Sequence, residues 1–173
     1  MRKVLLGVTG SIAAYKACDL VRLFVKNGDE VTVVMTEAAT RFVTPLTFQT
    51  LSRNPVFVDQ FAPPASWKPE HISLAEAPDL VVVAPATANI LAKMRAGLAD
   101  DLLSATLLAT RAPIWVAPAM NTGMWENAAT RENLTVLKTR GIRVIEPESG
   151  DLACGVKGAG RMAAPEQILD SIG

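Results

Sequence analysis

Few side chains in this sequence are suited to acid–base or nucleophilic chemistry. The chain has one histidine, His71, and two cysteines, Cys18 and Cys154. An imidazole is the side chain whose ordinary pKa lies nearest neutrality, so His71 is the natural general base if the protein is an enzyme. A single histidine on the surface or at a helix end needs no catalytic role, and the sequence leaves both interpretations open.

The two cysteines lie in contrasting surroundings. Cys154 falls in a glycine-rich stretch close to Lys157 and Arg161, whose positive charges lower the pKa of a thiol from about 8.5. These neighbours favour a reactive Cys154 on an exposed, mobile loop. Cys18 lies within a predicted helix, where a thiol packs like a small hydrophobic side chain. With no CxxC pair and no Cys/His cluster, neither a disulfide framework nor a zinc site is expected.

Asn121 follows a predicted strand in the segment Pro118-Ala119-Met120-Asn121-Thr122-Gly123-Met124-Trp125. An asparagine amide carries two N–H donors that can hold a carboxylate, and methionine and tryptophan can cover an aromatic cofactor. The alternative is an ordinary helix cap with local packing around it. The composition of the segment favours neither.

Two turns have the composition of a phosphate site. Thr9-Gly10-Ser11 joins the first predicted strand to the first helix, where N–H groups and the positive end of the helix dipole face a ligand. A second polar turn, Thr87-Ala88-Asn89, follows the fourth predicted strand. The GxGxxG and Walker lysine patterns are absent, so a mononucleotide such as FMN fits better than NAD or ATP. The alternative is that Gly10 and Ser11 form only a tight turn and a cap.

The elements that must position these residues alternate as in a parallel sheet covered by helices. Strands are predicted at 3–8, 30–35, 55–58, 79–84, 114–117 and 143–146. Helices are predicted at 11–27, 38–51 (as a pair), 86–95, 100–110, 126–140 and 165–172, and loops at 59–70 and 149–161. The expected fold is one α/β domain over residues 1–173, a doubly wound, Rossmann-like or flavodoxin-like sheet of about six strands with helices on both faces.

Several local signals refine this expectation. Ser11 is expected to cap the first helix and Gly28 to end it, while Asp100 and Asp101 are expected to cap the helix that follows them. In the common doubly wound order, the first and fourth strands lie side by side where the strand order reverses. The polar turns after these two strands are therefore expected to form one cleft.

Composition limits the classes of function. The chain has 173 residues, half of them hydrophobic, which suits a single domain with a sizeable core. Seventeen basic and 17 acidic side chains give a net charge of zero, which argues against binding nucleic acid or a charged membrane surface. No apolar run approaches the roughly 18 residues of a membrane span, and the N-terminal apolar stretch is short for a signal peptide. A cytoplasmic location is expected.

Four segments together resemble the homo-oligomeric flavin-containing cysteine decarboxylases. They are GSIAAYK at 10–16, Glu70-His71-Ile72, the PxMNxxMW block at 118–125, and Ala153-Cys154-Gly155 with Gly160-Arg161-Met162. The resemblance covers essentially the whole chain and is greatest to the phosphopantothenoylcysteine decarboxylases, the flavoprotein half of bifunctional coenzyme A biosynthesis proteins. The PxMNxxMW block and the cysteine segment are specific, whereas related flavin prenyltransferases share the general form of the glycine turn.

The resemblance implies an FMN-dependent carboxy-lyase that converts (R)-4′-phospho-N-pantothenoylcysteine to 4′-phosphopantetheine. In this family the substrate thiol is oxidised to a thioaldehyde, CO2 leaves, and the resulting enethiol is reduced again. The flavin supplies the electron sink that the substrate lacks.

The resemblance also implies roles for particular residues. His71 corresponds to the active-site base, Asn121 to the residue that binds the substrate carboxylate, and Cys154 to the proton donor in enethiol reduction. Substrate binding is assigned to Asn121, Ala153, Cys154, Lys157 and Arg161. Cofactor binding is assigned to Gly10, Ser11, Ile12, Thr36, Glu37, Ala38, Thr87, Ala88, Asn89 and Ala119, and no metal is expected.

Members of this family build the FMN site where the subunits of a trimer meet, commonly within a dodecamer. A homotrimer or dodecamer is therefore expected, with a fused or separate phosphopantothenate–cysteine ligase as a possible partner. Two alternatives stay open, namely a peptidyl-cysteine decarboxylase with the same motifs and a non-catalytic flavin-binding regulatory protein. Lys157 and Arg161 favour an anionic substrate, and the presence of both Asn121 and Cys154 favours an enzyme.

Overall fold

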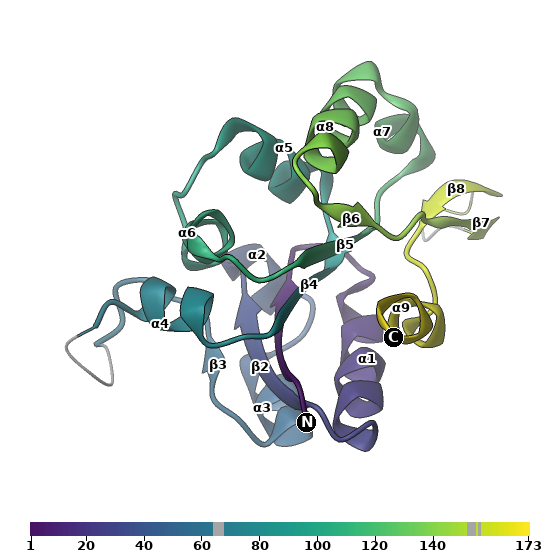
Figure 1. Ribbon diagram of the computed structural model, residues 1–173. Helices are drawn as coiled ribbons and strands as arrows, with labels where there is room; N and C mark the ends of the chain where they lie inside the picture. The colour runs from purple at the N-terminus through teal and green to yellow at the C-terminus, as the bar shows by residue number, and fades with distance from the viewer. Residues whose placement is uncertain (64–67, 152–154, 156) are drawn as a thin grey trace.

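A parallel sheet with helices on both sides forms the centre of the computed structural model (Figure 1). The structure describes residues 1–63, 68–151, 155 and 157–173. The sheet has six strands in the order β3-β2-β1-β4-β5-β6. They are β1 (Lys3–Val8), β2 (Glu30–Met35), β3 (Val56–Phe57), β4 (Leu80–Ala86), β5 (Ile114–Pro118) and β6 (Arg143–Val144). The predicted doubly wound α/β fold is confirmed, and the strand order reverses between β1 and β4.

Alternate side chains of the strands enter two separate cores. In β1, Val4 and Leu6 join one core and Leu5 joins the other. The first core is closed by α1 (Ala14–Lys26), α3 (Pro45–Ser52) and α9 (Pro165–Ile172). The second is closed by α4 (Glu70–Glu76), α5 (Ala88–Ala96), α6 (Leu102–Ala109) and α8 (Ala128–Thr139). Because both faces are covered, every residue of β4 is buried, as its continuous apolar sequence predicts.

The two ends of helix α1 differ in how well they match the predicted signals. Its buried residues recur at helical spacing, from Ala14 through Leu20 to Phe24. Gly28 follows the helix with a φ of 87°, so the predicted stop is confirmed. Ser11 as the helix cap was wrong, because the chain first makes a tighter turn in which the amide of Ala14 donates to the carbonyl of Ser11 at 2.9 Å. Ala13 takes the cap position instead.

The predicted helix at 126–140 is confirmed as α8 (Ala128–Thr139), and a short helix before it, α7 (Thr122–Glu126), was not predicted. Helix α7 ends at Asn127, whose side chain accepts from the amide of Ala129 at 2.9 Å and so begins α8. At the start of α6, Asp101 caps the helix as predicted, accepting from the amide of Ser104 at 2.7 Å. The predicted helical pair at 38–51 is confirmed as α2 (Glu37–Thr40) and α3.

The prediction of a loop at 149–161 was wrong for the described residues. Strand β7 (Glu148–Asp151) pairs with β8 (Lys157–Arg161) in an antiparallel ribbon at one edge of the molecule (Figure 1). A Cβ atom added to Gly158 would lie 2.2 Å from Oγ1 of Thr122, and one added to Gly160 would lie 2.2 Å from the carbonyl oxygen of Met120. These glycines therefore reflect a strand packed tightly against a neighbouring turn rather than a mobile loop.

Candidate active site

A cleft of about 460 Å³ lies at the carboxyl ends of β1, β2 and β4. Its lining residues are Thr9, Gly10, Thr36, Glu37, Ala38, Thr87, Ala88, Asn89, Ile90, Lys93, Asp101 and Met124. The volume lies in the range of small-molecule and cofactor sites, and the place is the switch point where open α/β sheets bind ligands. The two polar turns do form one cleft, as the sequence predicts.

Thr9 holds the two neighbouring strand ends together. Its buried hydroxyl donates to the carbonyl oxygen of Pro85 at 2.6 Å and accepts from the amide of Thr87 at 3.1 Å. The end of β1 and the turn after β4 are thereby held at a fixed separation. This one side chain sets the spacing between two walls of the cleft.

Gly10 is required by the close approach of α2. A Cβ atom at this position would lie 2.6 Å from the Cβ of Ala38, well inside van der Waals contact. Thr36 caps α2 by accepting from the amide of Ala39 at 3.2 Å, and Thr87 caps α5 by accepting from the amide of Ile90 at 3.3 Å. The start of α5 therefore lies at the cleft, where the positive end of the helix dipole favours an anionic group.

Lys93 and Asp101, which both line the cleft, belong to an ion-paired cluster. The ammonium of Lys93 lies 2.7 Å from Oδ1 of Asp100 and 2.7 Å from Oδ2 of Asp101. Burial disfavours the charged form of Lys93, but its hydrogen bonds to the two carboxylates outweigh burial and raise its pKa. Burial raises the pKa of the Asp101 carboxyl. The hydrogen bonds from Lys93 and Ser104 lower this pKa by more, so it lies below its ordinary value.

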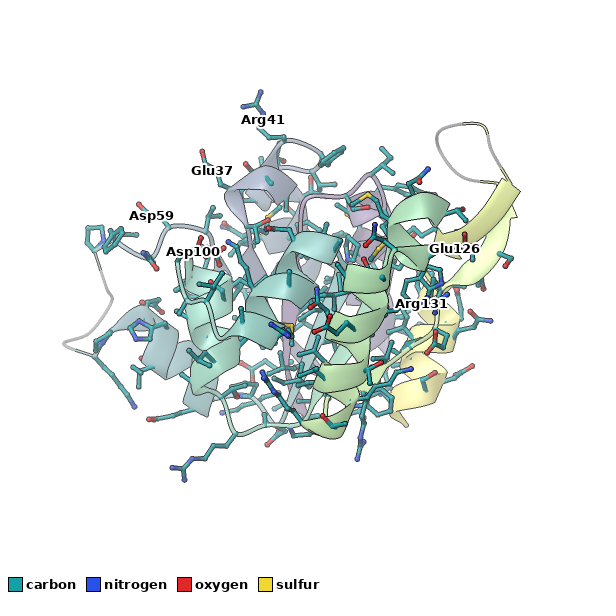
Figure 2. The ribbon with its side chains drawn as sticks, turned by 90° about the horizontal axis from the view of Figure 1, so that it is seen from above. Glu37, Arg41, Asp59, Asp100, Glu126 and Arg131 are labelled. Carbon is teal, nitrogen blue, oxygen red and sulfur yellow. The ribbon has the colours of Figure 1, made fainter. Side chains whose placement is uncertain are left out.

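Sequence reasoning did not assign Lys93 or Asp101 to the cleft. The available signal was spacing, because Lys93 follows Asn89 by four residues and therefore shares its helix face. Asp101 was assigned only a capping role, and its carboxylate serves both the cap and the ion pair. Figure 2 shows Glu37 and Asp100 on one side of the molecule, with Glu126 and Arg131 on the side nearer the β7–β8 ribbon.

Asn121 is exposed and caps α7, its Oδ1 accepting from the amide of Gly123 at 2.8 Å. The cap uses the oxygen of the amide. Met124 lines the cleft from the same short helix. Trp125 is buried beneath the guanidinium of Arg131, 4.7 Å from its ring centre. Asn121 itself is not among the described residues that line the cleft, although Met124, three residues further along, is.

His71 lies in the first turn of α4, a helix that sequence reasoning missed, and is half-buried. It is not among the described residues that line the cleft. Helix α4 packs against α6 and lies at the flank of the molecule (Figure 1). Within one chain, the structure does not bring the predicted base into the cleft.

The remaining predicted residues divide into three groups. Ser11, Ile12 and Ala119 do not line the cleft; Ile12 is exposed, and Ala119, directly after β5, is buried. Arg161 is exposed on β8, and the backbone of Lys157 begins that strand. Ala153 and Cys154 lie outside the described residues.

In the described ranges, no group of three or more His, Cys, Asp or Glu side chains could hold a metal ion.

Among the helices that the structure describes, none is long and apolar enough to cross a membrane.

Comparisons with known proteins agree with this geometry. The Flavoprotein family profile matches residues 1–173. The chain is 51% identical over 168 residues to the coenzyme A biosynthesis bifunctional protein CoaBC of Bacillus subtilis (strain 168), covering 97% of this chain and 41% of that protein. It therefore spans about two-fifths of the length of that curated relative.

Two solved structures share the fold. One is a PPC decarboxylase variant in complex with pantothenoylaminoethenethiol, with a TM-score of 0.89 and 35% identity over 99% of this chain and 96% of that one. The other is the FMN-binding protein AtHal3, with a TM-score of 0.86 and 35% identity over 99% and 94% of the two chains. Together with the profile match over its whole length, these likenesses show that the chain belongs to the Flavoprotein family.

Proposed function

We propose that this chain is an FMN-dependent carboxy-lyase that decarboxylates (R)-4′-phospho-N-pantothenoylcysteine to 4′-phosphopantetheine in coenzyme A biosynthesis. The observation that carries the proposal is the cleft at the carboxyl ends of β1, β2 and β4, which is lined in part by Met124 of α7, the helix that Asn121 caps. The likenesses to a coenzyme A biosynthesis protein and to a PPC decarboxylase support it.

The residues of the cleft fit FMN. The start of α5, with the hydroxyl groups of Thr36 and Thr87, suits the phosphate and the ribityl chain. Met124, half of whose surface is exposed, offers apolar surface to a flavin ring. When bound, FMN would supply the two-electron oxidation of the substrate thiol and return the electrons to the enethiol.

Three side chains have distinct tasks in the proposal. Asn121 binds the substrate carboxylate through its N–H donors and adds no charge that would oppose the loss of CO2. His71 accepts a proton as the base, a role that an imidazole can fill through its unprotonated ring nitrogen. Cys154 donates a proton when the enethiol is reduced. Arg161, exposed on β8, and Lys157 suit the anionic phosphate of the substrate.

The position of His71 supports an assembly of several copies. Because His71 does not line the cleft of its own chain, we propose that it completes the cleft of a neighbouring copy in a homotrimer or dodecamer. The exposed apolar side chains Ile12, Tyr15, Phe42 and Leu46 support such contacts. The name of the Bacillus subtilis relative as a bifunctional protein supports a fused or separate ligase as partner. A cytoplasmic location follows from this metabolic role.

The decisive experiment is incubation of the purified yellow protein with 4′-phosphopantothenoylcysteine, followed by mass spectrometry of the product. The expected product has lost one CO2, and the flavin spectrum returns to that of the oxidised cofactor. A cysteine-terminated peptide is tested in parallel. Turnover of the peptide alone identifies a peptidyl-cysteine decarboxylase, and bound FMN without turnover of either compound identifies a binding protein.

A further inference from the structure

We propose that Thr122 is a positioning residue whose hydroxyl holds β8 against the turn that carries Asn121. The consequence for turnover rests on the proposed function, whereas the contact itself does not. Thr122 is the first residue of α7 and is half-buried. Sequence reasoning gave it no role.

Two hydrogen bonds join the Asn121 turn to β8, one from each side of Asn121. The amide of Met120 donates to the carbonyl oxygen of Gly160 at 3.0 Å, and the hydroxyl of Thr122 donates to the carbonyl oxygen of Ala159 at 2.8 Å. The donors flank Asn121 in sequence, and the acceptors are consecutive residues of one strand. The position of Asn121 relative to β8 is therefore fixed from both sides.

The glycines of β8 allow this approach. No Cβ atom fits at Gly158, where it would lie 2.2 Å from Oγ1 of Thr122. None fits at Gly160, which has a φ of 122° and faces the carbonyl oxygen of Met120. Backbone atoms of the Asn121 turn and of β8 thus lie in direct contact. The Thr122 hydroxyl is a side-chain donor in this contact, so a substitution can remove its hydrogen bond selectively.

The contact links two residues assigned to the substrate. Asn121 lies between the two donors, and Arg161 follows directly after the two acceptors, at the end of β8. If the Thr122 hydrogen bond is lost, β8 can shift relative to the turn. The distance between Asn121, which is proposed to bind the substrate carboxylate, and Arg161, which is proposed to bind its phosphate, is then no longer fixed. Small displacements of substrate-positioning groups have large effects on rate.

The test compares Thr122→Val, which keeps the shape and removes the hydroxyl, with Thr122→Ser, which keeps the hydroxyl. Thr135→Val is the matched control, because the Thr135 hydroxyl also donates to a carbonyl oxygen, that of Arg131 at 2.9 Å, on the exposed face of α8. Each FMN-loaded variant is measured for kcat/KM with 4′-phosphopantothenoylcysteine, for FMN affinity, and for hydrogen exchange at the Met120 amide and in β8.

Thr122→Val is expected to lower kcat/KM by about tenfold and to speed exchange at the Met120 amide, with FMN affinity unchanged. Thr122→Ser and Thr135→Val should behave like the wild type in both measurements. Wild-type exchange and turnover in Thr122→Val would overturn the proposal, as would a Thr122→Ser variant as impaired as Thr122→Val. If the wild type itself fails to turn over the substrate, the proposed function fails, and the exchange comparison still decides the role of Thr122.

Discussion

The ammonium of Lys93, on α5, lies 2.7 Å from Oδ2 of Asp101, the residue that caps α6. Both side chains line the cleft, so the pair joins two of its walls. The same carboxylate accepts from the amide of Ser104 at 2.7 Å, which ties the ion pair to the start of the helix. The Asp101 carboxylate, which caps the start of α6, is thereby also part of the wall of the cleft.

Lys93→Met should therefore lower both the stability of the fold and the affinity of the cleft for FMN. The Lys93 side chain is 16% exposed, and its loss leaves Asp100 and Asp101 without their cation. We expect the free energy of unfolding to fall by about 2 kcal/mol, since hydrogen bonds to charged groups are worth more than neutral ones. FMN affinity should fall as well. Urea unfolding of protein stripped of FMN and a fluorescence titration with FMN measure the two effects.

Arg95→Met is the matched control for this prediction. Arg95 lies on the same helix and pairs with Glu132 at 2.8 Å, with the two side chains 43% and 65% exposed. Exposed pairs contribute at most about 1 kcal/mol, so this variant should bind FMN like the wild type. If Lys93→Met and Arg95→Met lose equal FMN affinity and equal stability, the Lys93 ion pair does not contribute to the cleft.

Gly10→Ala should abolish FMN binding and have a smaller effect on the stability of the fold. The added methyl group would meet the Cβ of Ala38 at 2.6 Å and push α2 away from the turn after β1. Gly7→Ala is the comparison, because there the new methyl group meets the flexible end of Leu103 at 2.8 Å inside the core. We expect Gly7→Ala to lower stability and keep FMN.

A second substitution tests whether the Gly10 effect is steric. Ala38→Gly removes the atom that Gly10→Ala would strike, so the double variant should recover part of the FMN affinity measured by titration. No recovery would mean that the turn itself, rather than its contact with α2, was altered.

The Arg2–Asp29 pair should give a stability contribution that is lost in acid. Hydrogen bonds from Arg2 hold the pKa of the buried Asp29 below its ordinary value. A carboxyl whose folded-state pKa is depressed stabilises the fold above its unfolded pKa of about 3.9, and this contribution disappears as the pH falls through the folded-state pKa. Asp29→Asn should thus be less stable than the wild type at pH 7, and the difference should shrink below about pH 4.

Asp19→Asn controls for the general effect of removing a negative charge. Asp19 is 61% exposed and lies 3.8 Å from Arg22, so its loss should change stability little at either pH. Urea unfolding of the three proteins at a series of pH values makes the comparison. A difference between wild type and Asp29→Asn that stays constant down to pH 3 would contradict the assignment.

The sheet could be predicted because its strands are apolar runs bounded by turn residues, and the buried β4 is the clearest of these. The polar turns at Gly10 and Thr87 could be placed in one cleft because the doubly wound order brings β1 and β4 together. The β7–β8 ribbon could not be predicted, because Gly158 and Gly160 carry no strand signal. Their role depends on Met120 and Thr122, nearly 40 residues away in sequence.

The position of His71 could not be predicted from sequence for a different reason. Periodicity places a residue on an element, but the separation of His71 from the cleft depends on how α4 packs against α6. Lys93 was missed because an ion pair with Asp100 and Asp101 has no local sequence signal beyond its spacing.

The proposal that His71 acts in a neighbouring copy can be tested by mixing two inactive variants. His71→Asn and Asn121→Asp should each bind FMN and lack turnover; Asp also caps helices, so α7 should persist in the second variant. The two are co-expressed with different affinity tags, and oligomers that carry both tags are isolated. If a site takes Asn121 from one copy and His71 from the next, a mixed ring of three has one junction with both native residues, and about a third of the wild-type activity should return. If His71 serves the cleft of its own chain, every site keeps one defect, and mixed rings should be as inactive as their parents.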